Sequence, residues 1–126
     1  MKTKFTMLVA FFLIAATTIY AQEFQRQTVP ERVKTTMDKI TVPLKLDQSQ
    51  TDKTDSVFTQ FYTAQNKMRE DSRASGTRPD RSVYEKMMND RDEKLKAIFT
   101  ADQYTKFKNE VEDSLRPQRQ THEGNN

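Results

Sequence analysis

The sequence predicts an all-α protein of about four helices. Glycine and proline are scarce, with two and four residues respectively in 126, so long uninterrupted helices fit between them. Apolar residues in these stretches recur every three or four positions, which is the period of a helix. No stretch alternates apolar and polar residues with a period of two, so we expect no strand.

The first helix is expected to begin at the segment 28–31. Thr28 precedes a proline in the first turn, and Glu31 stands three positions after it, which is the pattern of a capping box. Pro43 ends the helix because it cannot supply a backbone N–H. The predicted inward face carries Val33, Met37 and Ile40.

A second, long amphipathic helix is expected from near Asp47 to about Ala74, where the segment 75–79 breaks the pattern. Its apolar stripe carries Val57, Phe61, Ala64 and Met68, with Phe58 and Tyr62 beside it. The third helix is expected from about Asp80 to Phe99, with a stripe of Tyr84, Met87, Met88, Leu95 and Ile98. The fourth runs from Ala101 to about Arg116, with Tyr104, Phe107, Val111 and Leu115 on one face.

Arg91 interrupts the apolar stripe of the third helix. We expect its charged end to reach water over its aliphatic stem, and the alternative is a contact with acidic groups of a binding partner. Three acidic pairs on the helices are expected to form solvated faces, since lysines and arginines lie nearby and no calcium-loop spacing is present. They are Glu70-Asp71, Asp92-Glu93 and Glu112-Asp113.

Residues 1–21 have the pattern of a signal peptide, with two lysines, an apolar run from Phe5 to Ala16 and Ala21 at the expected cut. An uncleaved anchor is the alternative. Cleavage leaves one domain, 22–116, and a polar tail, 117–126, that we expect to be disordered. It also lowers the formal charge from +3 to +1. Basic and acidic residues are interspersed, so no nucleic-acid partner is expected. Cleavage, together with the lack of a cysteine that could carry a lipid, predicts no stable membrane anchor.

The residue types needed for most catalytic and metal chemistry are missing. The chain has no cysteine, and its one histidine, His122, lies in the polar tail. No Ser/His/Asp set, thiolate site or glycine-rich phosphate loop can therefore be assembled. We expect no enzyme activity, no catalytic residues, no metal and no cofactor.

The predicted mature chain is poor in large apolar residues: leucine, isoleucine, valine and phenylalanine make up 17 of its 105 residues. Each such side chain contributes only about 1.5–3 kcal/mol when it is fully buried. A monomer with so few of them would be marginally stable. This composition favours a homodimer, with a flexible open monomer as the alternative.

Two segments share a pattern of an apolar residue, a capping residue, two variable positions and a glutamine. In each, the capping side chain can accept the N–H of the glutamine, whose amide reaches back to the cap's own N–H. The glutamines are 53 positions apart. The residues are Leu46, Asp47 and Gln50 in the first copy and Phe99, Thr100 and Gln103 in the second.

The paired boxes resemble the LTxxQ-motif family of periplasmic stress proteins, the Spy/CpxP-like chaperones and regulators. The second copy matches better, although Phe99 replaces leucine, and in the first copy Asp47 replaces threonine. The resemblance covers about residues 44–116. It implies four helices in thin, curved hairpins that form an antiparallel dimer shaped as a cradle.

The resemblance also implies a soluble periplasmic protein that holds unfolded envelope proteins without ATP. The alternatives are a regulator that docks on an envelope-stress sensor kinase, and a structural or interaction protein of the envelope. Under the chaperone hypothesis six residues are candidates for client binding, because methionine and aromatic side chains adapt to varied apolar partners. They are Phe58, Phe61, Tyr62, Met87, Met88 and Arg91. For the apolar members the competing interpretation is an ordinary core or a dimer seam.

Overall fold

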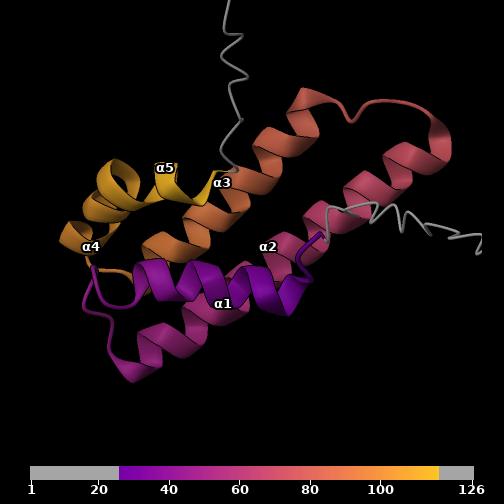
Figure 1. Cartoon of the computed structure of the whole chain (residues 1–126). Helices are drawn as coiled ribbons and strands as arrows, with labels where there is room; N and C mark the ends of the chain where they lie inside the picture. The colour runs from indigo at the N-terminus through magenta and orange to yellow at the C-terminus, as the bar shows by residue number, and fades with distance from the viewer. Residues whose placement is uncertain (1–25, 117–126) are drawn as a thin grey trace, which may run out of the picture.

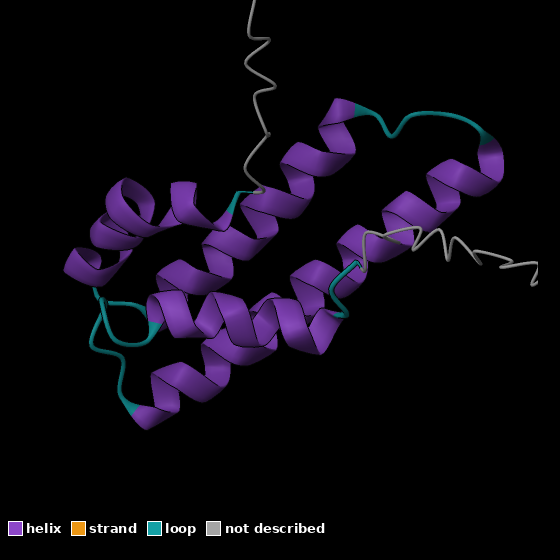
Figure 2. Cartoon of the chain, viewed as in Figure 1, coloured by secondary structure: helices purple, strands orange, loops and turns teal. Residues whose placement is uncertain are grey.

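The computed structural model describes residues 26–116, and these are helical with no strand, which confirms the all-α prediction (Figures 1 and 2). The predicted signal peptide and the tail with His122 lie outside the described residues. Among the described helices, none is long and apolar enough to cross a membrane. The four helical segments are α1 (Val29–Ile40), α2 (Gln48–Ser75), α3 (Arg81–Ile98), and a last helix formed by α4 (Ala101–Lys106), η1 (Phe107–Val111) and α5 (Glu112–Leu115).

The helix ends follow from local capping chemistry. The predicted box at α1 is present, with Thr28 and Glu31 each accepting from the other's backbone N–H. Gly76 ends α2 with φ 67°, a left-handed conformation that costs glycine little because it has no Cβ. Asp80 then caps α3 by accepting the N–H of Ser82. All four helical segments begin within one or two residues of the positions predicted from sequence.

The long helices α2 and α3 form a helical hairpin, and the other segments pack only against its base. Figure 1 shows α1 lying along α2, and the last helix folding back beside the C-terminal half of α3. No residue between Gln65 and Arg91 is buried. The far half of the hairpin is therefore only two helices thick. A dimer that would cover it stays a prediction.

The core lies at the base of the hairpin and is largely aromatic. Phe58 from α2 and Phe107 from the last helix are fully buried, with ring centroids 6.4 Å apart. Phe99 packs edge-on against Phe107 at 5.9 Å. Such pairs add about 0.5–1.5 kcal/mol each beyond the burial of their area. Ile40 and Leu95, also fully buried, bring α1 and α3 into the same core.

The last helix contains one π-helical turn, which the sequence pattern does not predict. The N–H of Glu112 donates to the carbonyl of Phe107, five positions earlier. A π turn holds one more residue than an α-helical turn and often occurs at functional sites. Here it allows Phe107, Val111 and Glu112 all to be buried.

Candidate functional site

Both predicted capping boxes are present in full. Asp47 accepts the N–H of Gln50 on its side chain at 2.7 Å, and its own N–H donates to Gln50 Oε1 at 3.1 Å. In the second copy Thr100 Oγ1 accepts the N–H of Gln103 at 3.2 Å, and the Thr100 N–H donates to Gln103 Oε1 at 2.9 Å. The apolar residues before the caps face the core, with Leu46 half-buried and Phe99 buried.

The two boxes also contact each other, which was not predicted. Gln50 Nε2 donates to Gln103 Oε1 at 2.7 Å, and Gln103 Nε2 donates back to Gln50 Oε1 at 3.3 Å. The second N–H of each amide reaches a carbonyl near the other box, Ile98 for Gln50 and Leu44 for Gln103, both at 3.1 Å. Every donor and acceptor site of both amides is thus used. The paired amides join the start of α2 to the α3–α4 junction.

Three of the six candidate client-binding residues are core residues in this structure. Phe58, Phe61 and Tyr62 are 0%, 7% and 6% exposed, so the competing interpretation as core fits them better. Met87 and Met88 are partly buried and pack against the same core from α3. A client could not reach Phe58 while the described helices stay packed, and Phe61 and Tyr62 present only their edges to the surface grooves.

The expectation that Arg91 reaches water is wrong. The residue is 5% exposed, and its Nη2 donates to Asp92 Oδ1 at 2.7 Å and to Glu112 Oε1 at 2.8 Å. Its guanidinium also lies over the rings of Phe61 and Phe107, at 5.1 and 5.6 Å. Arg91 turns inward because Glu112, on another helix, offers it a buried acceptor.

Two of the acids predicted to be solvated belong to this buried cluster. The side chain of Glu112 is 8% exposed and that of Asp92 16%. Lys108 joins both, at 2.6 Å from Glu112 and 3.0 Å from Asp92. Burial opposes the charge of Lys108, but the hydrogen bonds to the two carboxylates outweigh it and raise its pKa. With two cations and two anions, the cluster is neutral and joins α3 to the last helix.

Of the three large apolar side chains that are exposed among the described residues, Val42 lies in the α1–α2 connection and the other two lie on the far half of α3. Val83 is 49% exposed and Tyr84 42%. Met87 and Met88 follow one turn later, and we name these four residues the distal patch. Tyr84 and Met88 line a groove of about 140 Å³ that runs from Arg69 of α2 toward the base of the hairpin. There its lining includes the edges of Phe61 and Tyr62, the buried pair of Arg91 and Glu112, and the end of the last helix.

Neither a metal centre nor a family assignment emerges from the described residues. Within 26–116, no group of three or more His, Cys, Asp or Glu side chains is placed to hold a metal ion. Comparisons with known proteins found no family model, no curated protein and no solved structure that matches this chain. The functional argument therefore depends on the motif, the junction and the surface.

Proposed function

We propose that this protein is a periplasmic, ATP-independent chaperone that binds unfolded or aggregation-prone envelope proteins. The proposal starts from the resemblance of the two boxes to the LTxxQ-motif family. The observation that carries it is the pairing of Gln50 with Gln103. The pairing explains why the motif occurs twice. Each glutamine hydrogen-bonds to the side-chain amide of the other copy and to a backbone carbonyl beside that copy.

The distal patch is the surface on which we propose that clients bind. It replaces the buried rings of Phe58, Phe61 and Tyr62 in that role and keeps Met87 and Met88 from the sequence prediction. Tyr84 supplies an exposed aromatic ring with a polar end, and the methionines are flexible enough to fit varied apolar segments. The two-helix thickness of the hairpin here leaves Val83 and Tyr84 exposed and Met87 and Met88 partly exposed.

A light-scattering assay of client aggregation tests the proposal. The chain from Gln22 onward should suppress aggregation of several unrelated clients at near-stoichiometric ratio. Replacing Tyr84 and Met88 by serine should raise the concentration needed at least threefold. Val42→Ser is the matched control, because Val42 is 79% exposed but lies outside the hairpin, in the α1–α2 connection.

The failure of this assay would have a definite meaning. If the unmodified chain does not slow aggregation at large excess, the chaperone proposal is wrong. Affinity capture from envelope extracts would then separate the two alternatives. One enriched sensor kinase would support the regulatory function, and its absence would favour a structural or interaction protein.

We also propose that the protein is a homodimer. The far half of the hairpin contributes no buried residue in a single chain, and a second copy is a partner that could cover part of it. Sedimentation equilibrium at micromolar concentration tests this directly. A mass of one chain across the concentration range would refute it.

A further inference from the structure

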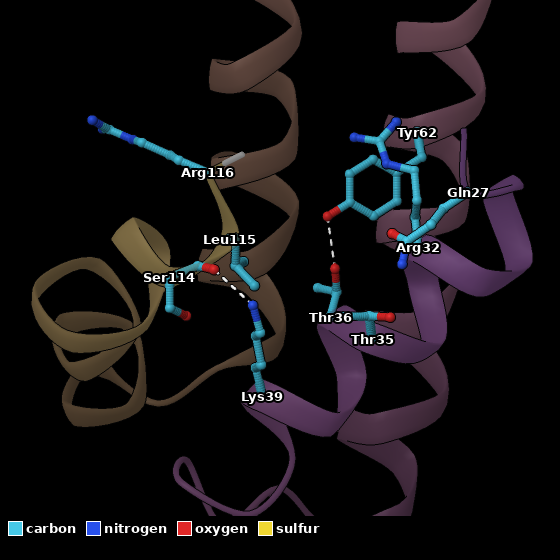
Figure 3. Close-up of a pocket in the computed structure, with 9 residues that line it drawn as sticks. All are labelled: Gln27, Arg32, Thr35, Thr36, Lys39, Tyr62, Ser114, Leu115 and Arg116. Carbon is cyan, nitrogen blue, oxygen red and sulfur yellow. Dashed lines mark hydrogen bonds between the residues drawn. The ribbon is translucent and has the colours of Figure 1, made fainter. Parts of the chain in front are cut away.

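A second candidate site lies where α1, α2 and the C-terminal end of α5 meet (Figure 3), and it adjoins the groove of Tyr84 and Met88, with which it shares Arg32, Tyr62, Leu115 and Arg116. It is a pocket of about 340 Å³. Its nine lining residues include the cations Arg32, Lys39 and Arg116 and no aspartate or glutamate. This imbalance is unusual in a chain whose charges are otherwise interspersed.

Arg32 is held in place by its neighbours, and one nitrogen of its guanidinium has no hydrogen-bond acceptor among the described residues. Its guanidinium stacks on the ring of Tyr62 at 3.9 Å, and Nη2 donates to Gln65 Oε1 at 2.7 Å. Figure 3 shows the guanidinium beside that ring. Its Nη1, however, is buried and has no partner among the described residues. A buried N–H without an acceptor is unfavourable, and an arginine nitrogen is best satisfied by an oxyanion.

The electrostatics of the site also favour a negative ligand. Burial is the main cause that lowers the pKa of Arg32. The phenol of Tyr62 opposes this effect, the nearby cation Arg69 adds to it, and the phenol of Tyr84 makes a smaller opposing contribution. The closest acid along the same helix, Glu31, accepts from the N–H and the hydroxyl of Thr28. The positive charge at this pocket is therefore not balanced by a carboxylate in its lining.

Further polar groups stand around the pocket. Tyr62 Oη and Thr36 Oγ1 share a hydrogen bond of 2.7 Å, and Figure 3 shows the hydroxyl of Tyr62 pointing toward the gap between α1 and α5. Lys39 Nζ crosses that gap and donates to the carbonyl of Ser114 at 2.8 Å, which leaves two of its three donors for a ligand. Arg116 extends away in this view and is paired with Asp113 only at 3.7 Å on the exposed surface.

We propose that this pocket binds an oxyanion, a carboxylate or phosphate group, with Arg32 and Lys39 as its principal ligands. The volume is well above the roughly 30 Å³ that one water molecule occupies in the liquid, so a group of several atoms fits. The oxyanion has two possible sources: a free small anion, or the terminal carboxylate of an unfolded polypeptide. This inference goes beyond the chaperone proposal and does not depend on it.

Binding is tested by ¹⁵N–¹H NMR titration of the chain from Gln22 onward. Three probes are used at constant ionic strength, made up with chloride: inorganic phosphate, a short apolar peptide with a free C-terminus, and the same peptide amidated. We expect saturable shifts at the amides of Thr35, Thr36 and Ser114. If only phosphate causes these shifts, the pocket is a site for small anions. If only the peptide with a free C-terminus causes them, the pocket is a site for a terminal carboxylate.

Variants separate a specific site from general charge. Lys39→Gln and Arg32→Lys should each weaken binding at least tenfold, the second because lysine lacks the guanidinium fork. Lys34→Gln is the matched control: it makes the same charge change as Lys39→Gln on α1, at an exposed residue paired with Asp38. The proposal would be overturned if the shifts did not saturate for any probe, or if Lys34→Gln weakened binding as much as Lys39→Gln does. Well-dispersed spectra verify that each variant is folded.

Discussion

Gln50 and Gln103, 53 residues apart, form a reciprocal pair of side-chain amides, with N···O distances of 2.7 and 3.3 Å. Each amide oxygen also accepts the backbone N–H of its own helix cap. The local capping device and the long-range contact are therefore made by the same two side chains. A change in either glutamine should affect both helix starts.

A double-mutant cycle on this pair should reveal strong coupling. Gln50→Ala or Gln103→Ala should each lower the free energy of unfolding by about 2 kcal/mol, because the cap is lost and the partner amide is left with unpaired donors. Since the first change already removes the mutual contact, the double variant should lose about 1.5 kcal/mol less than the sum. Urea denaturation followed by circular dichroism measures all three values.

The control for this cycle is a cap that shares no partner with the pair. Thr28→Ala removes the cap of α1 and should cost about 1 kcal/mol. Combined with Gln50→Ala, its effect should add to within about 0.5 kcal/mol. Additive behaviour of Gln50 and Gln103 themselves would show that the amide pair contributes nothing to stability.

The fold could be predicted closely because its boundaries depend on local chemistry. Capping boxes, Gly76 and the helical spacing of apolar residues all act within a few positions, so they can be read from sequence. The meeting of Gln50 with Gln103 could not, because it depends on how the α2–α3 hairpin brings its two ends together.

The prediction failed where the environment of a side chain is supplied by a distant segment. A charged residue within an apolar stripe normally reaches water, and Arg91 does not, because Glu112 lies beside it in space. The spacing of the aromatic residues also could not decide whether they are exposed or buried. Phe58 and Phe61 have the same periodicity whether a client, a second copy or the last helix covers them.

The buried pair of Arg91 and Glu112 should be costly to break. Glu112→Leu leaves Arg91 with only Asp92 as its acidic partner, and we expect it to lower the free energy of unfolding by about 3 kcal/mol. Arg91→Met combined with Glu112→Leu should recover much of that loss, since no uncompensated charge remains between them. Guanidinium denaturation is unsuitable because it screens charges, so urea should be used.

A surface pair provides the comparison. Lys34 and Asp38 lie 2.9 Å apart, but their side chains are 78% and 65% exposed, so Lys34→Met should cost about 0.5 kcal/mol or less. If Glu112→Leu were no more damaging than Lys34→Met, the buried cluster would not be what joins α3 to the last helix.

The cap of α1 should weaken in acid. Hydrogen bonds from the backbone N–H of Thr28, and secondly from its hydroxyl, lower the pKa of Glu31. A carboxyl whose pKa is lower in the folded state stabilises the fold above its unfolded pKa. That contribution is lost as the pH falls through the folded pKa. The protection of amides in the first turn of α1, measured relative to the intrinsic exchange rate at each pH, should therefore fall as the pH drops below the ordinary range of a glutamate.

Titration by ¹³C NMR of the Glu31 carboxyl checks this directly. In Thr28→Val the hydroxyl is gone but the backbone donor stays, so the pKa should rise only part of the way to its ordinary value. A full return would mean that the hydroxyl, and not the backbone, is the main cause. No change at all would mean that the capping box does not persist in solution.

The π turn should be needed to bring Glu112 to Arg91. Deleting the exposed Asn109 would leave Glu112 four positions after Phe107 instead of five, so an ordinary α-helical bond could form. The residues after the deletion would then rotate by about 100° relative to Phe107, which carries Glu112 away from the guanidinium. We expect the free energy of unfolding to fall by at least about 2 kcal/mol, and adding Glu112→Leu should lower it no further.

Asn109→Ala is the matched control and should change the free energy of unfolding by less than about 0.7 kcal/mol. A deletion variant as stable as the parent would show that the extra residue is accommodated without serving the buried cluster.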